Sequence, residues 1–221
     1  MMAKPPEHVR ILSAQLNTFP KSNRTEDCAK MQMIHALMVN SQANIVITQE
    51  DNTDWRNTTA SKRPKERCSS WFESLNVHSA YNINEENERR QRLQGGVSTW
   101  SINDATHRIE SRGVDNTSLG RWNYIRYQGR NGLATRVYSI YRPCKSDGTR
   151  SVYSQQVRHL SSIQDARCPQ VAMVEDLKKE LEQARDDGDQ LIIGGDFNLD
   201  LRSEAWSDFT ADLELENAIF R

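Results

Sequence analysis

Near its C-terminal end the chain reads Gln190-Leu191-Ile192-Ile193-Gly194-Gly195-Asp196-Phe197-Asn198. The run Leu191-Ile192-Ile193 is short and rich in β-branched residues, which is typical of a strand buried on both faces. Asp196 and Asn198 are two residues apart, so in an extended chain their side chains lie on one side while Phe197 points to the other. The stretch therefore predicts a buried strand that ends in a pair of polar side chains.

The same pattern occurs at two earlier places in the sequence. Val9–Leu16 predicts a first strand, which Asn17 follows directly. Ala43–Thr48 predicts another strand buried on both faces, with Glu50 two residues beyond it. In α/β folds the carboxyl ends of the strands are where ligands bind. If the three strands are parallel neighbours, a single pocket receives the side chains of Asn17, Glu50, Asp196 and Asn198.

These polar residues have the chemistry of a metal site. Carboxylates at the edge of an apolar sheet are costly unless they are paired or bound to a cation. A small set of carboxylate and amide oxygens suits Mg²⁺ or Mn²⁺ that holds a phosphate group. For any one residue alone, a turn or a helix cap is the more common explanation. A polar residue after each of three predicted buried strands favours a metal site over three unrelated turns or caps.

The remaining elements indicate the fold class. Helices are predicted from Asn23, which has capping-box spacing to Glu26, from Pro169, and around Trp206. Strands alternate with helices near both ends, with a meander of strands between them, which favours an α/β fold with a mixed sheet or two packed sheets. One domain is expected over 1–221, with a flexible tail at 1–8. The strands of the meander are predicted at residues 96–102, 107–112, 122–128 and 134–141.

Composition limits the possible functions. Hydrophobic residues make up 36% and charged residues 27% of the 221 residues, which is typical of a globular protein. No apolar run approaches the ~20 residues of a membrane helix, and no signal-peptide core is visible, so no membrane partner or secretion is expected. The widely spaced cysteines indicate reduced thiols in an intracellular protein, cytoplasmic or nuclear. These are Cys28, Cys68, Cys144 and Cys168.

The formal net charge is −1, so any binding to nucleic acid must come from a local basic surface. Two groups of basic residues stand beside aromatic residues, a combination common on nucleic-acid surfaces. For the second group a solvated strand face is an equally good explanation. The first group is Arg56, Lys62, Arg63, Lys65 and Arg67, and the second is Arg121, Arg126, Arg130, Arg136 and Arg142.

The segment Gly194–Asn198 resembles the G-D-F-N signature of the endonuclease/exonuclease/phosphatase superfamily, whose fold is DNase I-like. Gln49-Glu50 resembles the metal-binding glutamate motif of that superfamily, and Gln15-Leu16-Asn17 its N-terminal asparagine motif. The order and rough spacing of the motifs agree as well. Two further stretches resemble the intermediate strands of retrotransposon-type endonuclease domains: Gly95-Gly96-Val97 and Val137–Pro143.

The resemblance implies a four-layer α/β sandwich, in which two packed mixed sheets are flanked by helices, and Mg²⁺-dependent hydrolysis of phosphoesters. It implies that Glu50 binds the metal, that Asn17 helps to orient metal or phosphate, and that Asp196 orients or activates the attacking water. It further implies that Asn198 holds the phosphate and steadies Asp196, and that Tyr141 hydrogen-bonds a phosphate oxygen. Candidate substrate-binding residues are Arg142, Arg63, Lys62 and Lys65.

The resembling family also uses a Ser/Asn-Asp segment and a closing Asp-His pair, which have no counterpart here. Asp208 and Asp212 are too close to Asn198 to match them. We therefore expect the domain to be incomplete at its C-terminal side and weakly active on its own. The histidines, His8, His35, His78, His107 and His159, are expected on the surface or on helix faces.

Three functions remain open at this point. The first is an endonuclease that cuts DNA, with RNA as an alternative substrate, in a mobile element whose longer product carries a C-terminal extension or a reverse transcriptase. The second is a phosphatase of the same superfamily that acts on inositol phosphates or sphingolipids. The third is a non-catalytic remnant that binds nucleic acid without cutting it.

Overall fold

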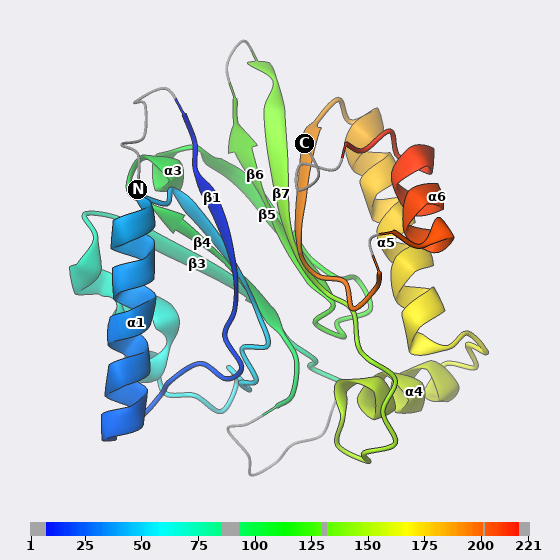
Figure 1. Cartoon of the computed structure of the whole chain (residues 1–221), viewed down its shortest axis with the longest axis horizontal. Coiled ribbons are helices and arrows are strands. Elements are labelled where there is room, and N and C mark those ends of the chain that lie inside the picture. Colours follow the sequence, from blue (N-terminus) through cyan, green and yellow to red (C-terminus); the bar gives the residue numbers. More distant parts are fainter. Residues whose placement is uncertain (1–7, 85–92, 130–131, 201, 217–221) are drawn as a thin grey trace.

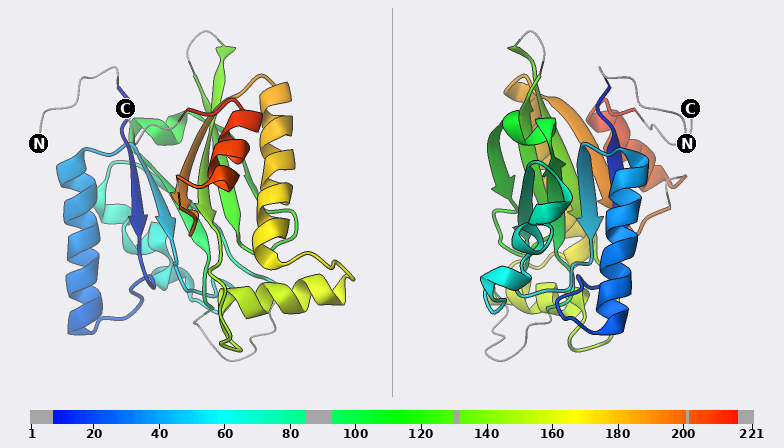
Figure 2. Two further views of the ribbon diagram at one scale, coloured as in Figure 1. Left: turned by 45° about the vertical axis from the view of Figure 1, so that its right-hand side comes forward. Right: turned by 90° about the vertical axis from the view of Figure 1, so that its left-hand side faces the viewer.

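The computed structural model describes residues 8–84, 93–129, 132–200 and 202–216 and contains two four-stranded mixed sheets packed face to face. Figure 1 shows α1 (Thr25–Ser41) over the outer face of one sheet, and α5 (Pro169–Asp186) with α6 (Glu204–Asp212) over the other. The same layers are visible from two further directions (Figure 2). The predicted four-layer α/β sandwich is thereby confirmed. Residues 1–7 of the expected tail lie outside the described residues.

The first sheet has the strand order β1-β2-β4-β3. β1 and β2 are parallel, whereas β4 is antiparallel to both β2 and β3. The register aligns Gln15 with Gln49, Gln49 with Val97, and Val97 with Ala80. The carboxyl ends of β1, β2 and β3 therefore lie at one edge of the sheet. The strand bounds are Ile11–Gln15 for β1, Ile45–Gln49 for β2, Leu75–Ala80 for β3 and Val97–Ile102 for β4.

The second sheet has the strand order β5-β6-β7-β8. β5 to β7 form an antiparallel meander, and β8 is parallel to β7, with Tyr141 aligned with Asp196. The strand bounds are Ile109–Val114 for β5, Trp122–Gln128 for β6, Ala134–Tyr141 for β7 and Gln190–Asp196 for β8. Between β7 and α5 the chain forms α4 (Val152–Ser162).

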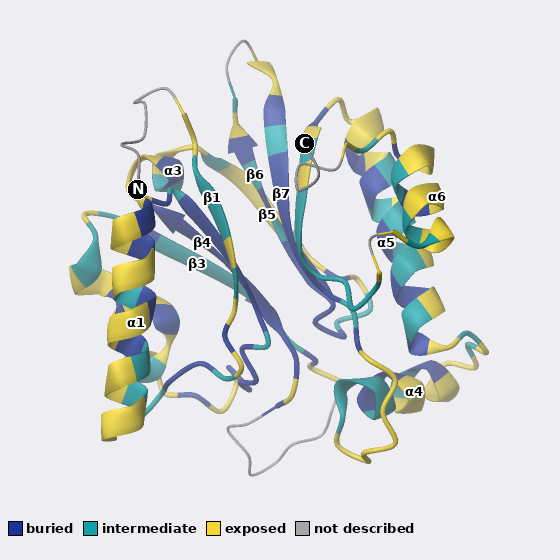
Figure 3. Cartoon of the chain, viewed as in Figure 1, coloured by how far each residue is buried: buried dark blue, intermediate teal, exposed yellow. Residues whose placement is uncertain are grey.

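The central strands of the first sheet, β2 and β4, are buried because both of their faces are covered. In β2, Val46 packs into the core beneath α1, while Ile45 and Ile47 pack into the core between the two sheets. Figure 3 shows the central strands buried and the outward face of α1 exposed. A continuous apolar run is therefore the correct pattern for this strand. Among the described residues, no helix is long and apolar enough to cross a membrane.

Several predicted elements need correction. The sequence reading missed β3, where Leu75 and Ala80 are buried but Asn76 to Ser79 are only partly buried, so no clear apolar run marks the strand. Residues 104–107 form the short helix α3, and the strand predicted at 107–112 therefore begins later, at Ile109. His78 lies on β3 with Nε2 3.1 Å from the carbonyl oxygen of Gly113, between the sheets rather than on the surface.

The predicted capping box at Asn23 is also wrong. The N-cap of α1 is Arg24, whose side chain makes no capping bond. Instead, the carboxylate of Asp27 accepts hydrogen bonds from the Ser22 amide at 2.8 Å and the Ser22 hydroxyl at 2.6 Å. These bonds lower the pKa of Asp27, and the carboxylate also sits favourably in the first helical turn.

Candidate functional site

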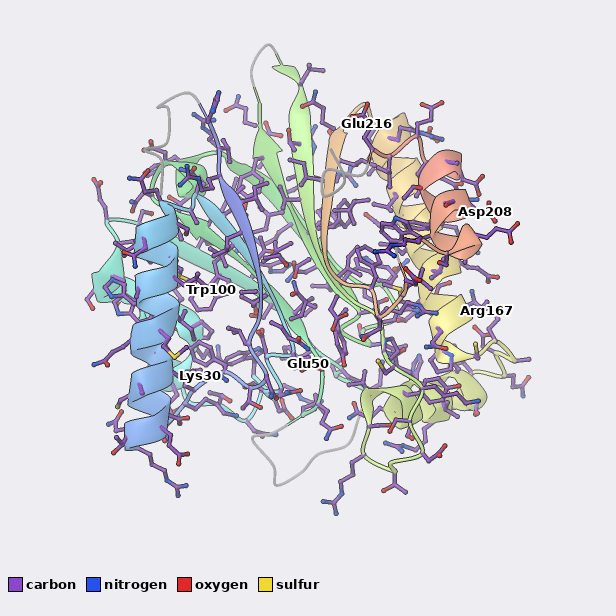
Figure 4. The ribbon with its side chains drawn as sticks, viewed as in Figure 1. Lys30, Glu50, Trp100, Arg167, Asp208 and Glu216 are labelled. Carbon is purple, nitrogen blue, oxygen red and sulfur yellow. The ribbon has the colours of Figure 1, made fainter. Side chains whose placement is uncertain are left out.

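Two hydrogen bonds join the carboxyl ends of the two sheets. The Tyr141 hydroxyl of β7 donates to Oε1 of Glu50, which follows β2, at 2.8 Å. Nε2 of Gln15, at the end of β1, lies 3.5 Å from Oδ2 of Asp196, at the end of β8. The structure therefore brings Glu50 and Asp196 to the same edge of the sandwich. Figure 4 labels Glu50 in the lower middle of the molecule, where the two sheets meet.

Glycines allow the two sheets to approach at this edge. A Cβ added at Gly194 would lie 2.4 Å from Cδ1 of Ile47, and one at Gly195 would lie 2.0 Å from the carbonyl oxygen of Ile140. Both distances are far below ordinary contact. At Gly194 the Ile47 side chain would have to move aside, and at Gly195 the main chain of β7 leaves no room for a side chain. Gly195 also has a φ of 149°. Gly195 is thus required by the pairing of β8 with β7 that places Asp196.

Three candidate site residues have left-handed backbone: Asn17 (φ 46°), Glu50 (φ 56°) and Asn198 (φ 44°). Asparagine adopts this conformation more readily than most residues, whereas for glutamate it is unusual. Strained backbone of this kind persists where surrounding contacts hold it, and it is often found at functional sites. The chain therefore turns sharply as it leaves β1, β2 and β8, with Asn17, Glu50 and Asn198 at the turns.

Lys30 of α1 holds the first of these turns. Its Nζ donates to the carbonyl oxygens of Asn17 at 3.0 Å and Thr18 at 2.7 Å. The Thr18 amide in turn donates to the Glu50 carbonyl oxygen at 2.7 Å, which ties the turn after β1 to the turn after β2. Figure 4 labels Lys30 on the α1 side of Glu50. Burial lowers the pKa of Lys30. Sequence reasoning missed this residue, because an isolated helical lysine gives no signal.

Asp196 and Asn198 form the turn after β8, and Arg142, which follows β7, contacts it. The Asn198 amide donates to Oδ1 of Asp196 at 3.0 Å, which fixes the orientation of this carboxylate. Nδ2 of Asn198 donates to the Arg142 carbonyl oxygen at 2.6 Å, and Nη1 of Arg142 donates to the Asn198 carbonyl oxygen at 2.9 Å. The Asn198 side chain and the Arg142 guanidinium therefore both brace the main chain around Asp196.

Tyr141 acts as a hydrogen-bond donor at this edge. Burial, followed by its bond to Glu50, raises the pKa of Tyr141. The phenol therefore keeps its proton at physiological pH. It is 7% exposed, whereas Glu50 is half-buried, so Oε2 of Glu50 can turn toward a ligand while Oε1 is fixed.

Asp51, which follows Glu50 in the chain, is a buried acid that sequence reasoning missed. Asp51 is 2% exposed; Oδ1 accepts from the Thr48 hydroxyl at 3.0 Å and Oδ2 accepts from the Ser98 hydroxyl. Burial raises its pKa to about 6. Asp51 thus belongs to the packing beneath the edge and does not add an exposed ligand to it.

The donors at this edge suit a hard divalent cation with few protein ligands. Glu50 supplies a carboxylate oxygen, Asn17 follows β1 at the same edge, and Asp196 faces them from the other sheet. Mg²⁺ commonly takes one or two carboxylates and keeps several waters. Within the described ranges, no group of three or more His, Cys, Asp or Glu side chains gathers as a ready metal cage. Carboxylate and amide oxygens of this kind are ligands that Mg²⁺ or Mn²⁺ takes in proteins.

The predicted basic residues fall into different environments. Lys65 is exposed, Lys62 is half-buried, and Arg63 donates to the Trp55 and Thr58 carbonyl oxygens at 3.3 and 3.4 Å. Arg121, Arg126 and Arg136 instead bind carboxylates. For this second group the contacts are structural ion pairs, and Arg130 lies outside the described residues.

Comparison with known proteins identifies the fold. No family model and no curated protein matches the chain, but solved structures do. An endonuclease/exonuclease/phosphatase family protein from Leptotrichia buccalis is 12% identical with a TM-score of 0.56, over 93% of this chain and 74% of that one. An AP endonuclease from Leishmania major is 11% identical with a TM-score of 0.54, over 87% and 55%.

An AP endonuclease from Archaeoglobus fulgidus is 14% identical with a TM-score of 0.52. The match covers 87% of this chain and 58% of the archaeal chain, so the protein described here spans less than two thirds of that enzyme's length. The shared architecture shows that this chain has the DNase I-like α/β sandwich, as the resemblance predicted. At these identities the likeness establishes the fold, and the retrotransposon-type kinship stays a prediction.

Proposed function

We propose that the chain is a phosphodiesterase that hydrolyses nucleic-acid backbones, DNA above all, with a divalent cation at the edge shared by Glu50 and Asp196. The observation that carries the proposal is the pair of cross-sheet contacts, Tyr141 to Glu50 and Gln15 to Asp196. Together they place two carboxylates and a neutral phenol around one edge. The fold supports the proposal, because proteins with this architecture include AP endonucleases.

Each residue has a role that its contacts allow. Oε2 of Glu50 would hold Mg²⁺ or Mn²⁺ with the help of Asn17, and the cation, when bound, neutralises charge on the phosphate. Asp196, with Oδ1 fixed by the Asn198 amide, would orient the attacking water and accept its proton at Oδ2. The Tyr141 hydroxyl, which donates to Glu50 in this structure, would turn its one proton to a phosphate oxygen as negative charge builds there. Arg142 and Asn198 keep the Asp196 turn in place.

The test is nicking of supercoiled plasmid with Mg²⁺ by the wild-type chain and by Asp196→Asn and Glu50→Gln. Loss of a positioned acid/base group typically costs ~10²–10⁴ in rate, so we expect Asp196→Asn to lose at least a hundredfold. Asp208→Asn is the matched control, since it removes an exposed carboxylate of α6 (Figure 4). If Asp208→Asn lowers the nicking rate as much as Asp196→Asn, Asp196 has no special role and the proposed active site is wrong.

Further assays on the same proteins separate the alternatives. Phosphate release from inositol phosphates without nicking would assign the chain to the phosphatases of this fold. Binding of DNA without cleavage of any substrate would identify a binding protein. A longer product that contains this chain, assayed beside it, tests whether further residues complete the site.

A further inference from the structure

A basic hollow lies beside the proposed active edge. It has a volume of about 510 Å³ and is formed between β3 and the segment that follows Glu50, including the short helix α2 (Pro64–Arg67). Arg56, Arg63 and Lys65 line it from one side and Tyr81 from the other. The volume is within the range of small-ligand sites in proteins, roughly 300–1,000 Å³.

The hollow opens at the same end of the sheet as Glu50. The register pairs Gln49 with Val97 and Val97 with Ala80, so Tyr81 follows β3 at the edge where Glu50 follows β2. One strand, β4, stands between them. At ~4.8 Å per strand spacing the lateral separation is about 10 Å. That equals about three nucleotides of a stacked strand at ~3.4 Å each.

The charge of the hollow is positive. Arg63 is held by the carbonyl oxygens of Trp55 and Thr58, which orient its guanidinium without neutralising it. Arg56 binds the buried carboxylate of Asp54, so this pair adds little net charge. Lys65 is exposed, and Glu66 is the one acidic side chain in the lining. The hollow therefore favours an anion.

Tyr81 gives the hollow an aromatic wall next to these cations. Its side chain is half-buried, and burial raises its pKa, so the ring stays neutral. Stacking of a base on an aromatic side chain contributes about 1–3 kcal/mol and does not depend on which base is present. In a duplex the bases stack on one another and cannot reach such a ring, whereas the bases of an unpaired strand can.

We propose that this hollow binds one nucleotide of an unpaired strand, with its phosphate on Lys65 and Arg63 and its base against Tyr81. The proposal rests on the proposed function, because it places this nucleotide about three positions from the phosphate at Glu50. It makes a substrate with a single-stranded or splayed segment the preferred substrate of the site.

The test is equilibrium binding, by fluorescence anisotropy in EDTA, of a labelled single-stranded oligonucleotide and of its duplex. EDTA prevents cleavage, so the result does not depend on activity. Tyr81→Ala should weaken single-strand binding about tenfold and leave duplex binding unchanged, while Tyr81→Phe keeps the ring and should bind as wild type. Equal loss on both nucleic acids, or none, would overturn the assignment of the base.

Lysine variants test the phosphate contact. Lys65→Gln should weaken single-strand binding about tenfold and reduce the slope of log Kd against log salt by about 0.7. Lys179→Gln removes an exposed charge from α5 and is the matched control. If Lys179→Gln weakens binding as much as Lys65→Gln, attraction is diffuse and the hollow is not a phosphate site. Plasmid nicking that survives this outcome would leave the proposed function standing.

Discussion

The two groups of basic residues look alike in the sequence and differ in the structure. In the second sheet, Arg121 is 1% exposed and binds Asp115 at 2.6 Å and Asp176 at 2.9 Å. Arg136 and Arg126 both bind Asp189, at 2.6 and 2.9 Å. In the segment after Glu50, by contrast, Lys65 is exposed and Arg63 is held only by main-chain carbonyls. The ion pairs of the second group join helix α5 and the turn after it to the second sheet, whereas Arg63 and Lys65 of the first group present charge to solvent.

The difference shows that the position of acids in space decides what a basic residue does. One acid, Asp189, binds both Arg126 and Arg136; it is 63 and 53 residues away from them in the sequence, between α5 and β8. The ion pairs continue along the helix layer, where Arg167 binds Asp165 and Asp176. Figure 4 labels Arg167 and Glu50 on different parts of the molecule. Interleaved arginines and aromatics are therefore a weak sign of a nucleic-acid surface.

The largest expected effect is on Arg121. Arg121→Ala leaves the carboxylate of Asp115, which is 0% exposed, without its main partner. Breaking a buried ion pair in this way typically costs about 3–5 kcal/mol of unfolding free energy. Urea unfolding should show this loss, while Lys179→Ala, on the exposed side of α5, should change it by less than about 0.5 kcal/mol.

Arg121→Ala also tests the contrast itself. At a temperature where the variant is folded, its affinity for a single-stranded oligonucleotide should equal that of the wild type. A clear loss of affinity in the folded variant would show that the second-sheet arginines also contact nucleic acid, and the comparison would fail.

Lys30 neither pairs with a carboxylate nor presents its charge to solvent; it binds main-chain carbonyl oxygens at the candidate site. It binds the carbonyl oxygens of Asn17 and Thr18 and thereby supports the turn beside Glu50. Lys30→Met keeps the stem and removes both bonds, so we expect a loss of about 1–3 kcal/mol in unfolding free energy. Cleavage should fall while the Kd for oligonucleotide in EDTA stays the same, since the residue positions Asn17 and does not touch substrate. A changed Kd with normal cleavage would contradict this role.

His78 lies between the sheets, and its protonation should make the stability of the protein depend on pH. Burial lowers its pKa, and nearby Arg112 lowers it further. Because the folded pKa lies below the unfolded value of about 6.5, the unfolded chain binds more protons, and stability falls as pH drops below that value. The contribution of His78 to the free energy of unfolding is fully present above the unfolded pKa. Below that pKa it falls by at most about 1.4 kcal/mol per pH unit.

Urea unfolding between pH 7 and pH 5 measures this dependence. His78→Asn keeps a polar side chain beside the Gly113 carbonyl and removes the titration. The difference between wild type and variant should therefore shrink as the pH falls. A difference that is constant over this range would mean that His78 titrates normally in the folded protein.

The sequence predicted the fold where local patterns are strong. The apolar runs predicted the strands β2 and β8, and the residues after them, Glu50 and Asp196, lie at one edge. β2 is buried throughout, as expected. The expected burial of β8 is wrong, because β8 is the edge strand of its sheet and Ile192 is 41% exposed. β3 was missed because its inward side chain His78 is polar and binds across the sheets. Alternation of apolar and polar residues fails as a signal when polar groups are satisfied in the interior.

The finer features of the candidate site could not be predicted. The contact between Gln15 and Asp196 joins residues 181 positions apart, and the support of Asn17 by Lys30 requires that α1 fold back along β1. Asp51 stands next to Glu50 in the sequence, yet it is buried among hydroxyls. Two adjacent acids with opposite environments cannot be told apart without the register of β2 and β4.

The smallest expected effect on stability is at Lys62 and Lys65, and it is the sharpest test of the contrast with Arg121. Within the described residues neither lysine forms an ion pair with a carboxylate, so their reversal to glutamate breaks no contact and should change unfolding free energy by about 0.5 kcal/mol or less. Binding should respond strongly, because two phosphate contacts are lost and two repulsions are added. The slope of log Kd against log salt should fall by about 1.4, at ~0.7 for each contact to a single strand. Substitution of the paired arginines should thus lower the unfolding free energy and leave the affinity for nucleic acid unchanged. Substitution of Lys62 and Lys65 should do the reverse. A stable double variant with an unchanged salt slope would show that nucleic acid, if it binds at all, approaches from another face.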